Sequence, residues 1–200
     1  MLIDFNLHEK ILFFNIGRYK HASDTFFEWK SKSFQKASFF EVQLTRNAPE
    51  RNIFYCITKG DIKIVYYVKN ETVFSMGSDL EVQSQLIDAL LEYIIEKFFY
   101  MYDESLLTSF YGDSCDIFNG FNTVIQETFK DYKNIDIIKT ALITCKGCGK
   151  TLTVIIKKKL IENSSKTTTP LVYIHSGHAL LLYIDREYKI RGSELVSVSY

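Results

Sequence analysis

The stretch that decides the fold is DLEVQSQLIDALLEYIIEKFFYMYD, residues 79–103. Its apolar side chains recur every three or four positions and form two adjacent rows, while the polar side chains share the remaining narrow face. This spacing is typical of a helix whose wide apolar surface needs cover on more than one side. Ser78 and Glu81 match the pattern of a capping box, so we predict that the helix begins at Asp79. Acidic side chains and Lys97 interrupt the apolar run, which excludes a membrane span.

Strand patterns precede this helix, and a second helix pattern follows it. Two apolar runs, Met1–His8 and Lys10–Ile16, are predicted to pair through a tight turn at His8-Glu9, and Gly60 marks a hairpin between runs 52–58 and 62–68. Strands joined mostly by short turns, with helices gathered on one face, predict an α+β fold in which an antiparallel sheet packs against helices. The other predicted elements are a short helix at 23–34 (with a strand as the alternative), a strand at 38–45, a loop at 46–51, a strand at 72–76, a short helix at 104–111 and a helix from Ser114 or Asp116 to Tyr132.

Charge is divided unevenly along the chain, although its total is zero. Residues 1–132 contain 13 Lys and Arg against 19 Asp and Glu, a net charge of −6, whereas residues 133–200 contain 11 against 5, a net charge of +6. A break in charge that coincides with a break in pattern indicates two modules. We therefore predict an α+β domain at 1–133 and a small β-module at 141–200, joined by Lys133–Thr140.

The composition bounds the class of protein. An apolar content of 46%, with 15% aromatic residues, excludes a largely disordered chain. The start of the sequence lacks a basic segment followed by a long apolar run, so we expect no signal peptide. Four cysteines, two of them isolated, do not form a disulfide framework, which favours a reducing, cytoplasmic location. An isolated cysteine such as Cys56 is expected to be a small core residue.

Four residues of the second module form the one group with recognisable chemistry. Cys145 and Cys148 are followed by His175 and His178 in the spacing C-x2-C-x26-H-x2-H. A Cys-x-x-Cys turn followed by glycine directs two sulfurs at one point, and two histidines on a tight turn could complete the tetrahedral shell of a structural zinc ion. Two alternatives remain open: a thiol redox pair, and reduced cysteines in a simple turn with the histidines as edge-strand residues.

Strands are predicted to surround this group. The runs 151–160, 171–175, 179–185 and 194–198 read as strands, with turns at 185–189 and at Gly192-Ser193. Lys157, Lys158 and Lys159 are interpreted as a solvated strand edge. Other catalytic motifs are missing, because the glycines around Lys150 lack the spacing of a phosphate-binding loop and no Gly-x-Ser-x-Gly motif occurs.

Several segments resemble known families. FYCITKGDIKIVYYV (54–68), LLEYIIEKFFYMYDESLLTSFYG (90–112) and IFNGFNTVIQETF (117–129) are similar in order and apolar pattern to longin-type domains. The opening segments MLIDFNL and KILFFNIG fit the first hairpin of one such domain. Similar patterns occur in the small chains of clathrin-adaptor complexes and in the N-terminal domain of the signal-recognition-particle receptor alpha subunit. The family's first helix is normally long, whereas residues 22–36 lack a long helical pattern. PLVYIHSGHALLLYIDREYKIRG (170–192) resembles a zinc-ribbon-like β-module of some archaeal proteins.

The resemblance implies a function in docking. Longin-like domains are not enzymes and serve as platforms for small GTPases or other trafficking partners at membranes. We therefore expect a non-catalytic adaptor with a structural zinc module, a small GTPase as its protein partner, and membrane association only through that partner. The alternative is a zinc-stabilised nucleic-acid-binding protein, which the +6 module motivates but the scarcity of aromatic residues among its basic residues disfavours. The sequence is also compatible with a homodimer.

Overall fold

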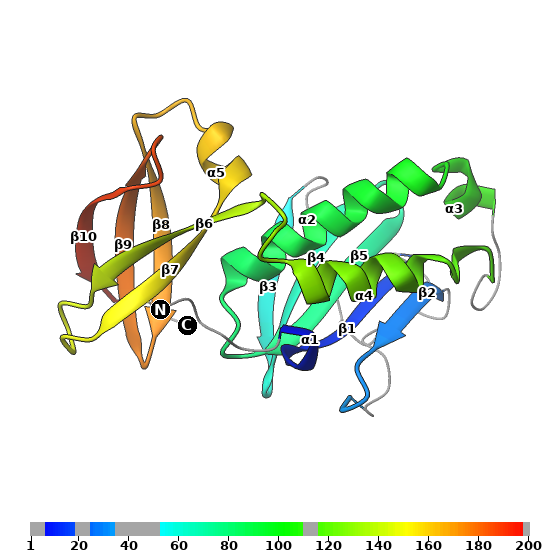
Figure 1. Ribbon diagram of the computed structural model, residues 1–200, viewed down its shortest axis with the longest axis horizontal. Coiled ribbons are helices and arrows are strands. Elements are labelled where there is room, and N and C mark those ends of the chain that lie inside the picture. The colour runs from blue at the N-terminus through cyan, green and yellow to red at the C-terminus, as the bar shows by residue number, and fades with distance from the viewer. Residues whose placement is uncertain (1–6, 19–24, 35–52, 110–115, 198–200) are drawn as a thin grey trace. The chain divides into compact units, whose positions relative to one another are not determined.

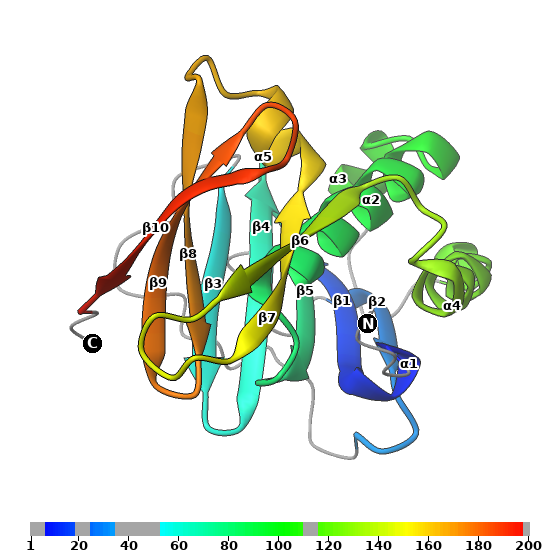
Figure 2. The same ribbon diagram turned by 60° about the vertical axis from the view of Figure 1, so that its left-hand side comes forward.

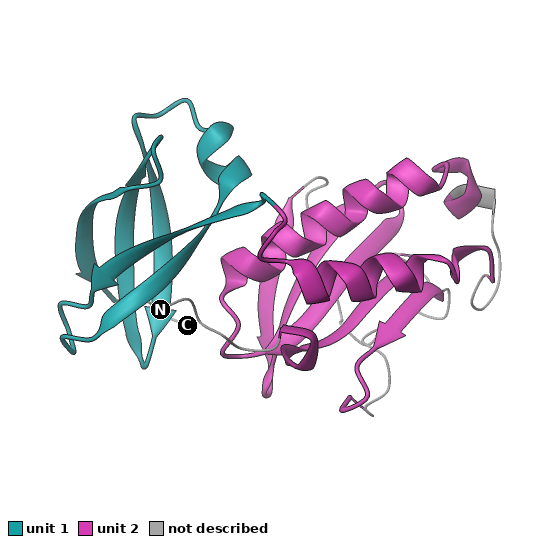
Figure 3. Cartoon of the chain, in the orientation of Figure 1, with its two compact units in different colours: residues 1–4, 136–200 teal, residues 5–135 magenta. Residues whose placement is uncertain are grey.

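The computed structural model describes residues 7–18, 25–34, 53–109 and 116–197. The chain divides into two compact units, which Figure 3 shows in different colours. Unit 1 consists of residues 136–200 with 1–4, and unit 2 consists of residues 5–135. Each unit has its own elements and its own core.

Unit 2 is built on a sheet of five antiparallel strands in the order β2-β1-β5-β4-β3, counted over the described residues (Figure 1). The predicted hairpin at Gly60 is confirmed, because β3 and β4 pair on either side of it and Gly60 has the positive φ of 61° that such a turn requires. The sheet strands are β1 (Ile11–Arg18), β2 (Thr25–Lys30), β3 (Phe54–Lys59), β4 (Ile62–Lys69) and β5 (Thr72–Asp79).

Two helices cover one face of this sheet and lie side by side (Figures 1 and 2). They are α2 (Ser84–Met101) and α4 (Phe121–Asp131). Their apolar positions bury aromatic side chains against the sheet, and the Phe98 ring contacts those of Phe74 and Phe121. The short elements α1 (Leu7–Lys10), α3 (Ser105–Ser109) and the 3-10 helix η2 (Asp116–Phe118) complete the unit.

The predicted start of the long helix is wrong by five residues. Ser78 and Asp79 belong to β5 and pair with β4, so the capping box does not form, and α2 begins at Ser84 without a side-chain cap. The backbone pairing of a central strand is lost if its last two residues join a helix, which explains the later start. The connection is held instead by Lys63, whose Nζ donates hydrogen bonds to the carbonyl oxygens of Leu80 and Val82.

Two further predictions near the N-terminus are wrong. Residues 25–30 form β2, so the strand alternative is confirmed in place of the short helix. Phe27 and Trp29 point together into the core beneath α4, where they contact Phe121 and Phe129. The expected tight turn at His8-Glu9 is replaced by α1. The predicted strand at 38–45 and the loop at 46–51 lie outside the described residues, as does most of the predicted strand at 1–8.

Unit 1 consists of two antiparallel sheets that enclose a core between them. Among the described residues, β6 pairs with β7, and β9 lies between β8 and β10. Figure 1 shows β6 and β7 crossing one face of the three-stranded sheet. Val154 and Ile156 of β7 share one buried cluster with Leu180 and Leu182 of β9. The elements are β6 (Ile138–Thr144), β7 (Thr151–Lys157), α5 (Lys158–Glu162), β8 (Thr168–His175), β9 (His178–Asp185) and β10 (Ile190–Val196).

Three predicted details of this unit are wrong. The segment 133–140, expected to be a linker, already contains the first residues of β6. Gly192 and Ser193 lie within β10 instead of forming a turn. The three lysines do not line a strand edge, because Lys157 ends β7 as a buried residue while the other two begin α5.

The predicted fold class is also wrong. We expected an α+β fold with an antiparallel sheet packed against helices, followed by a small β-module. In the described residues, ten strands form three antiparallel sheets, and strand accounts for 46% against 28% helix, so the fold is β-rich. The helical pattern of residues 79–103 covers only part of the described chain, and most of the other elements are strands. Segments such as 25–30 and 138–144 are rich in aromatic or β-branched residues, and these form strands where their side chains pack on a sheet.

Candidate metal centre

The first knuckle is the turn between β6 and β7, which carries Cys145 and Cys148. The Cys145 N–H donates to the Lys150 carbonyl oxygen at 2.9 Å, and the Gly149 N–H donates to the Cys145 carbonyl oxygen at 2.8 Å. Gly149 has a φ of 71°, a conformation that favours glycine. The Gly147 N–H also lies 3.4 Å from the Cys145 Sγ. These hydrogen bonds turn the chain back on itself, so that both sulfurs face the same point.

The second knuckle is the turn between β8 and β9. Its central residues Ser176 and Gly177 have φ values of 46° and 78°, and positive φ at both positions is the geometry of a type I′ hairpin turn. His175 and His178 flank this turn as directly opposed residues of the two strands. Directly opposed side chains lie on the same face of a hairpin, and the two imidazole rings are 5.5 Å apart.

The structure brings all four predicted site residues together. The ligand atoms of Cys145, Cys148, His175 and His178 all lie within 4.8 Å of one another. The Cys145 Sγ is 3.8 Å from the His178 Nδ1, and the Cys148 Sγ is 3.8 Å from the His175 Nε2. In a tetrahedral zinc site, bond lengths of about 2.3 Å to sulfur and about 2.0 Å to nitrogen place neighbouring S and N atoms about 3.5 Å apart. The four residues therefore lie close enough to bind one metal ion.

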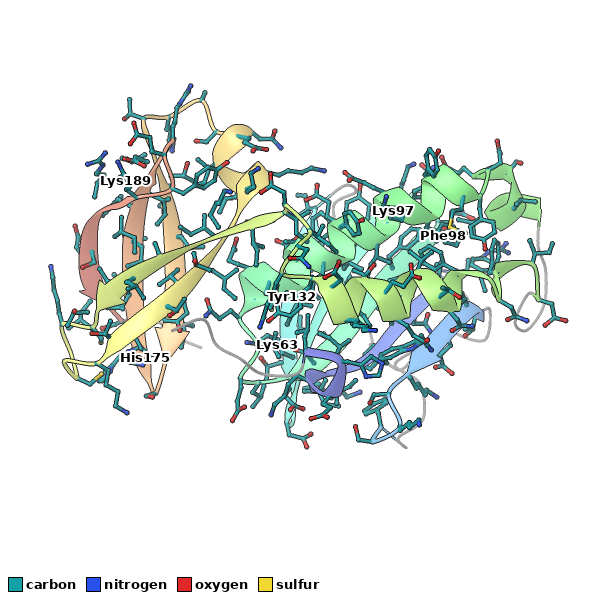
Figure 4. All side chains as sticks on the ribbon, viewed as in Figure 1. Lys63, Lys97, Phe98, Tyr132, His175 and Lys189 are labelled. Atoms are coloured by element: carbon teal, nitrogen blue, oxygen red, sulfur yellow. The ribbon has the colours of Figure 1, made fainter. Side chains whose placement is uncertain are left out.

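The cluster is buried on one side and open on the other. Cys145 is 1% exposed and belongs to the core of unit 1, whereas Cys148 is exposed and the two histidines are half-buried. Figure 4 places His175 at the end of the unit where the two knuckle turns lie. A metal ion at this position would be anchored to the core through Cys145.

The surroundings of Cys145 favour its thiolate form. A hydrogen bond with the His175 ring, aided by the backbone N–H groups of Cys148 and Gly147, lowers the pKa of the Cys145 thiol from 9.0 to about 6, while burial acts in the opposite direction. The thiolate is the form that binds metal ions. At neutral pH the Cys145 side chain is therefore mostly in the thiolate form that binds cations.

Three supporting residues were not singled out from the sequence. A methyl group added to Gly147 would lie only 3.1 to 3.2 Å from atoms of the His178 ring, so glycine gives the two knuckles room to approach. Lys146 donates a hydrogen bond from its Nζ to the Ser193 carbonyl oxygen at 2.6 Å and ties the first knuckle to β10. The Tyr173 ring stacks on the His175 ring with centroids 6.1 Å apart. The contacts of Gly147 and Lys146 join segments distant in sequence, whereas Tyr173 and His175 lie two residues apart on β8. Of the three, only the glycine had a pattern in the sequence that indicated its role.

Cys56 does not join this group. Cys56 lies in β3 of unit 2 and is exposed, so the expectation that it is a core residue is wrong. Its Sγ is 3.6 Å from the Ser84 Oγ at the start of α2. Cys115 lies outside the described residues.

In comparisons with known proteins, no family model and no curated protein matches this chain. Among the described residues, no helix has the length and apolar character needed to cross a membrane.

Proposed function

We propose that Cys145, Cys148, His175 and His178 bind one structural zinc ion. The observation that supports this proposal is that four protein donor atoms, two sulfurs and two nitrogens, lie within 4.8 Å of one another. Thiolate and imidazole donors in tetrahedral arrangement are the preferred ligands of zinc, and a shell filled by four protein ligands leaves no position for a substrate. The ion would hold together two hairpins that belong to different sheets.

The protein that this ion stabilises acts, in our proposal, as a non-catalytic adaptor. A small GTPase is the partner class to test first, because segments 54–68, 90–112 and 117–129 resemble longin-type domains, which dock such partners. The structural role of the zinc ion supports the proposal, since a closed metal shell contributes folding energy rather than a reactive centre. Association with a membrane would then occur through the partner.

Ion pairs in unit 1 engage part of the positive charge that motivates the nucleic-acid alternative. The net charge of +6 in residues 133–200 is the reason for considering nucleic acid. Several of these cations are engaged in ion pairs, and phosphate contacts would have to displace the acidic partners. Asp136 pairs with Lys139 and Lys158, Glu187 pairs with Lys189, and Asp185 pairs with Arg191.

The experiment that tests the proposal measures zinc and partner binding on the same preparation. Purified full-length protein is analysed for metal and then exposed to a panel of small GTPases, each loaded with GDP or with a GTP analogue. We expect about one zinc ion per chain and retention of a GTPase in one nucleotide state. Cys145→Ser should lose the zinc, whereas Cys56→Ser, a change in the other unit, should retain it.

Different outcomes would contradict different parts of the proposal. Full zinc content in Cys145→Ser, or none in the unaltered protein, would refute the metal site. Failure to retain any GTPase in either state would refute the partner class. Retention of nucleic acid, with an affinity that falls steeply as salt is raised, would support the alternative function instead.

A further inference from the structure

The outward face of the three-stranded sheet in unit 1 is apolar, although it is not part of the core. Along β8, the side chains of Leu171 and Tyr173 point into the core, while those of Val172 and Ile174 point outward and are 52% and 50% exposed. An antiparallel sheet with one wet face normally alternates apolar side chains inside with polar side chains outside. Here the strands carry apolar side chains on both faces, so the outward face lacks the polar side chains that normally cover it.

The strand register arranges this outward face in three rows. Each row contains one residue from each of the three strands, so the face consists of nine residues. The middle row crosses the sheet from Val172 through Leu181 to Glu194, and Glu194 is the one charged residue among the nine. The face thus consists of an apolar patch with a single carboxylate at its β10 edge. We call it the outer face, and its rows are Pro170–Tyr183–Gly192, Val172–Leu181–Glu194 and Ile174–Ala179–Val196.

The dimensions of the outer face indicate which kind of partner fits on it. Three strands about 4.8 Å apart, with five residues each at a rise of about 3.3 Å, give a patch of about 14 by 17 Å. Such a patch is far smaller than the roughly 800 Å² per partner that a stable interface between two copies needs. It matches one α-helix, which is about 10 Å wide and about 16 Å long after three turns. A single helix on a sheet face is also the usual way in which a sheet is covered.

The charge of the outer face indicates which charged side chains that helix should carry. Glu194 is exposed and lies directly beside the apolar centre of the patch. A helix that lies on Val172 and Leu181 would bring its own flank next to this carboxylate. A basic side chain at the flank gains a charge-assisted hydrogen bond, whereas an acidic one is repelled.

We propose that the outer face binds one amphipathic helix of a partner protein, with a Lys or Arg beside its apolar stripe. This inference is based on the proposed function as an adaptor and names the surface and the partner chemistry. The site is linked to the metal centre, because Ile174 and Ala179 at one end of the face adjoin the knuckle residues His175 and His178. Zinc would hold the register of β8 and β9 at that end.

A display library tests the proposal directly. The library contains 14-residue helices with a fixed leucine stripe and random residues along both flanks, and it is selected on the full-length, zinc-loaded protein. We expect enriched helices to carry Lys or Arg on one flank, and their affinity to fall at least tenfold for Ile174→Lys. The control variant is Leu142→Lys, since Leu142 is 65% exposed but lies on β6 in the other sheet. It should leave the affinity unchanged. Glu194→Lys should reverse the preference toward acidic flanks.

Several results would overturn the inference. They are the absence of any enriched helix, equal loss of affinity in Leu142→Lys and Ile174→Lys, and flanks without charge preference. Self-association that Ile174→Lys abolishes, or binding to anionic lipid vesicles that the same variant abolishes, would assign the face to a second copy or to a membrane instead. GTPase retention measured on the same variants separates the two proposals. If a GTPase is retained but no helix is enriched, the outer face is excluded and the adaptor function stands.

Discussion

Gly147 determines how closely the two knuckles of the metal centre approach each other. We predict that Gly147→Ala lowers zinc affinity by about 10- to 100-fold, the range seen when groups that position ligands are altered. The added methyl group would press on the His178 ring, whose nearest atom is 3.1 Å away. Competition with a fluorescent chelator measures the affinity. In the control Gly149→Ala, the new methyl group meets open space and only the backbone at φ 71° is strained, so stability should fall with a smaller effect on zinc.

Cys145 should give metal binding a defined pH dependence. Its pKa of about 6 lies below the ordinary value of 9.0, so the thiolate is already formed in the folded protein at neutral pH. Zinc affinity should therefore change little between pH 8 and pH 7 through this residue. As the pH falls through about 6, protons compete for the sulfur, and each further unit should lower the affinity at least about tenfold. Zinc titrations across this range check the prediction, and constant affinity down to pH 5 would contradict it.

At the scale of one element, β5 carries two buried serines that differ in their bonding. Both are 0% exposed, but the Ser78 Oγ donates a hydrogen bond to the Asp79 carbonyl oxygen, whereas the Ser75 Oγ has no partner among the described residues. An unsatisfied buried hydroxyl opposes folding, and a bonded one contributes about 1 kcal/mol. We predict that Ser75→Ala leaves the free energy of unfolding unchanged or raises it by about 1 kcal/mol. Ser78→Ala should lower it by a similar amount.

Urea denaturation of the two serine variants measures both changes on one scale. Ser75 is paired with Asn15 of the neighbouring strand β1, and the Asn15 amide also has no partner among the described residues. If Ser75→Ala destabilised the protein as much as Ser78→Ala, the Ser75 hydroxyl would have to form a bond in solution, for example to a buried water molecule.

At the scale of the whole molecule, the two units should respond differently to loss of the metal. The zinc ion would join two sheets of unit 1, and unit 2 has a separate core around α2. We predict that chelation increases amide hydrogen exchange in β8 and β9 and leaves that of α2 unchanged, with recovery when zinc is added. Mass spectrometry of peptides from both units measures the exchange. Equal protection of β8 and β9 with and without zinc would contradict a structural role.

Local signals were enough for part of the fold. The turn at Gly60 was predicted because a glycine between two strand patterns leaves few other conformations. The apolar rows of α2 followed from helical spacing, whereas its length did not, since α2 has 18 residues and the predicted helix covered 79–103. The start of α2 could not be predicted from local patterns, because strand pairing outweighed the capping box at Ser78. The strand conformation of β2 could not be decided either, because the aromatic pattern around Phe27 is compatible with both helix and strand. Local preference is a weak constraint where a segment can gain sheet hydrogen bonds.

The sequence alone determined which residues could form the metal centre, since two Cys and two His with turn spacing have few other uses together. Only the tertiary structure decided that the four meet. Cys148 and His175 are separated by 26 residues, and the antiparallel strands of two different sheets must pack on one core before their side chains approach. The room that Gly147 leaves for His178 and the apolar outer face of the sheet arise in the same way. The spacing of residues along the chain determines which ligand types occur together, whereas packing between distant segments determines how close their side chains lie.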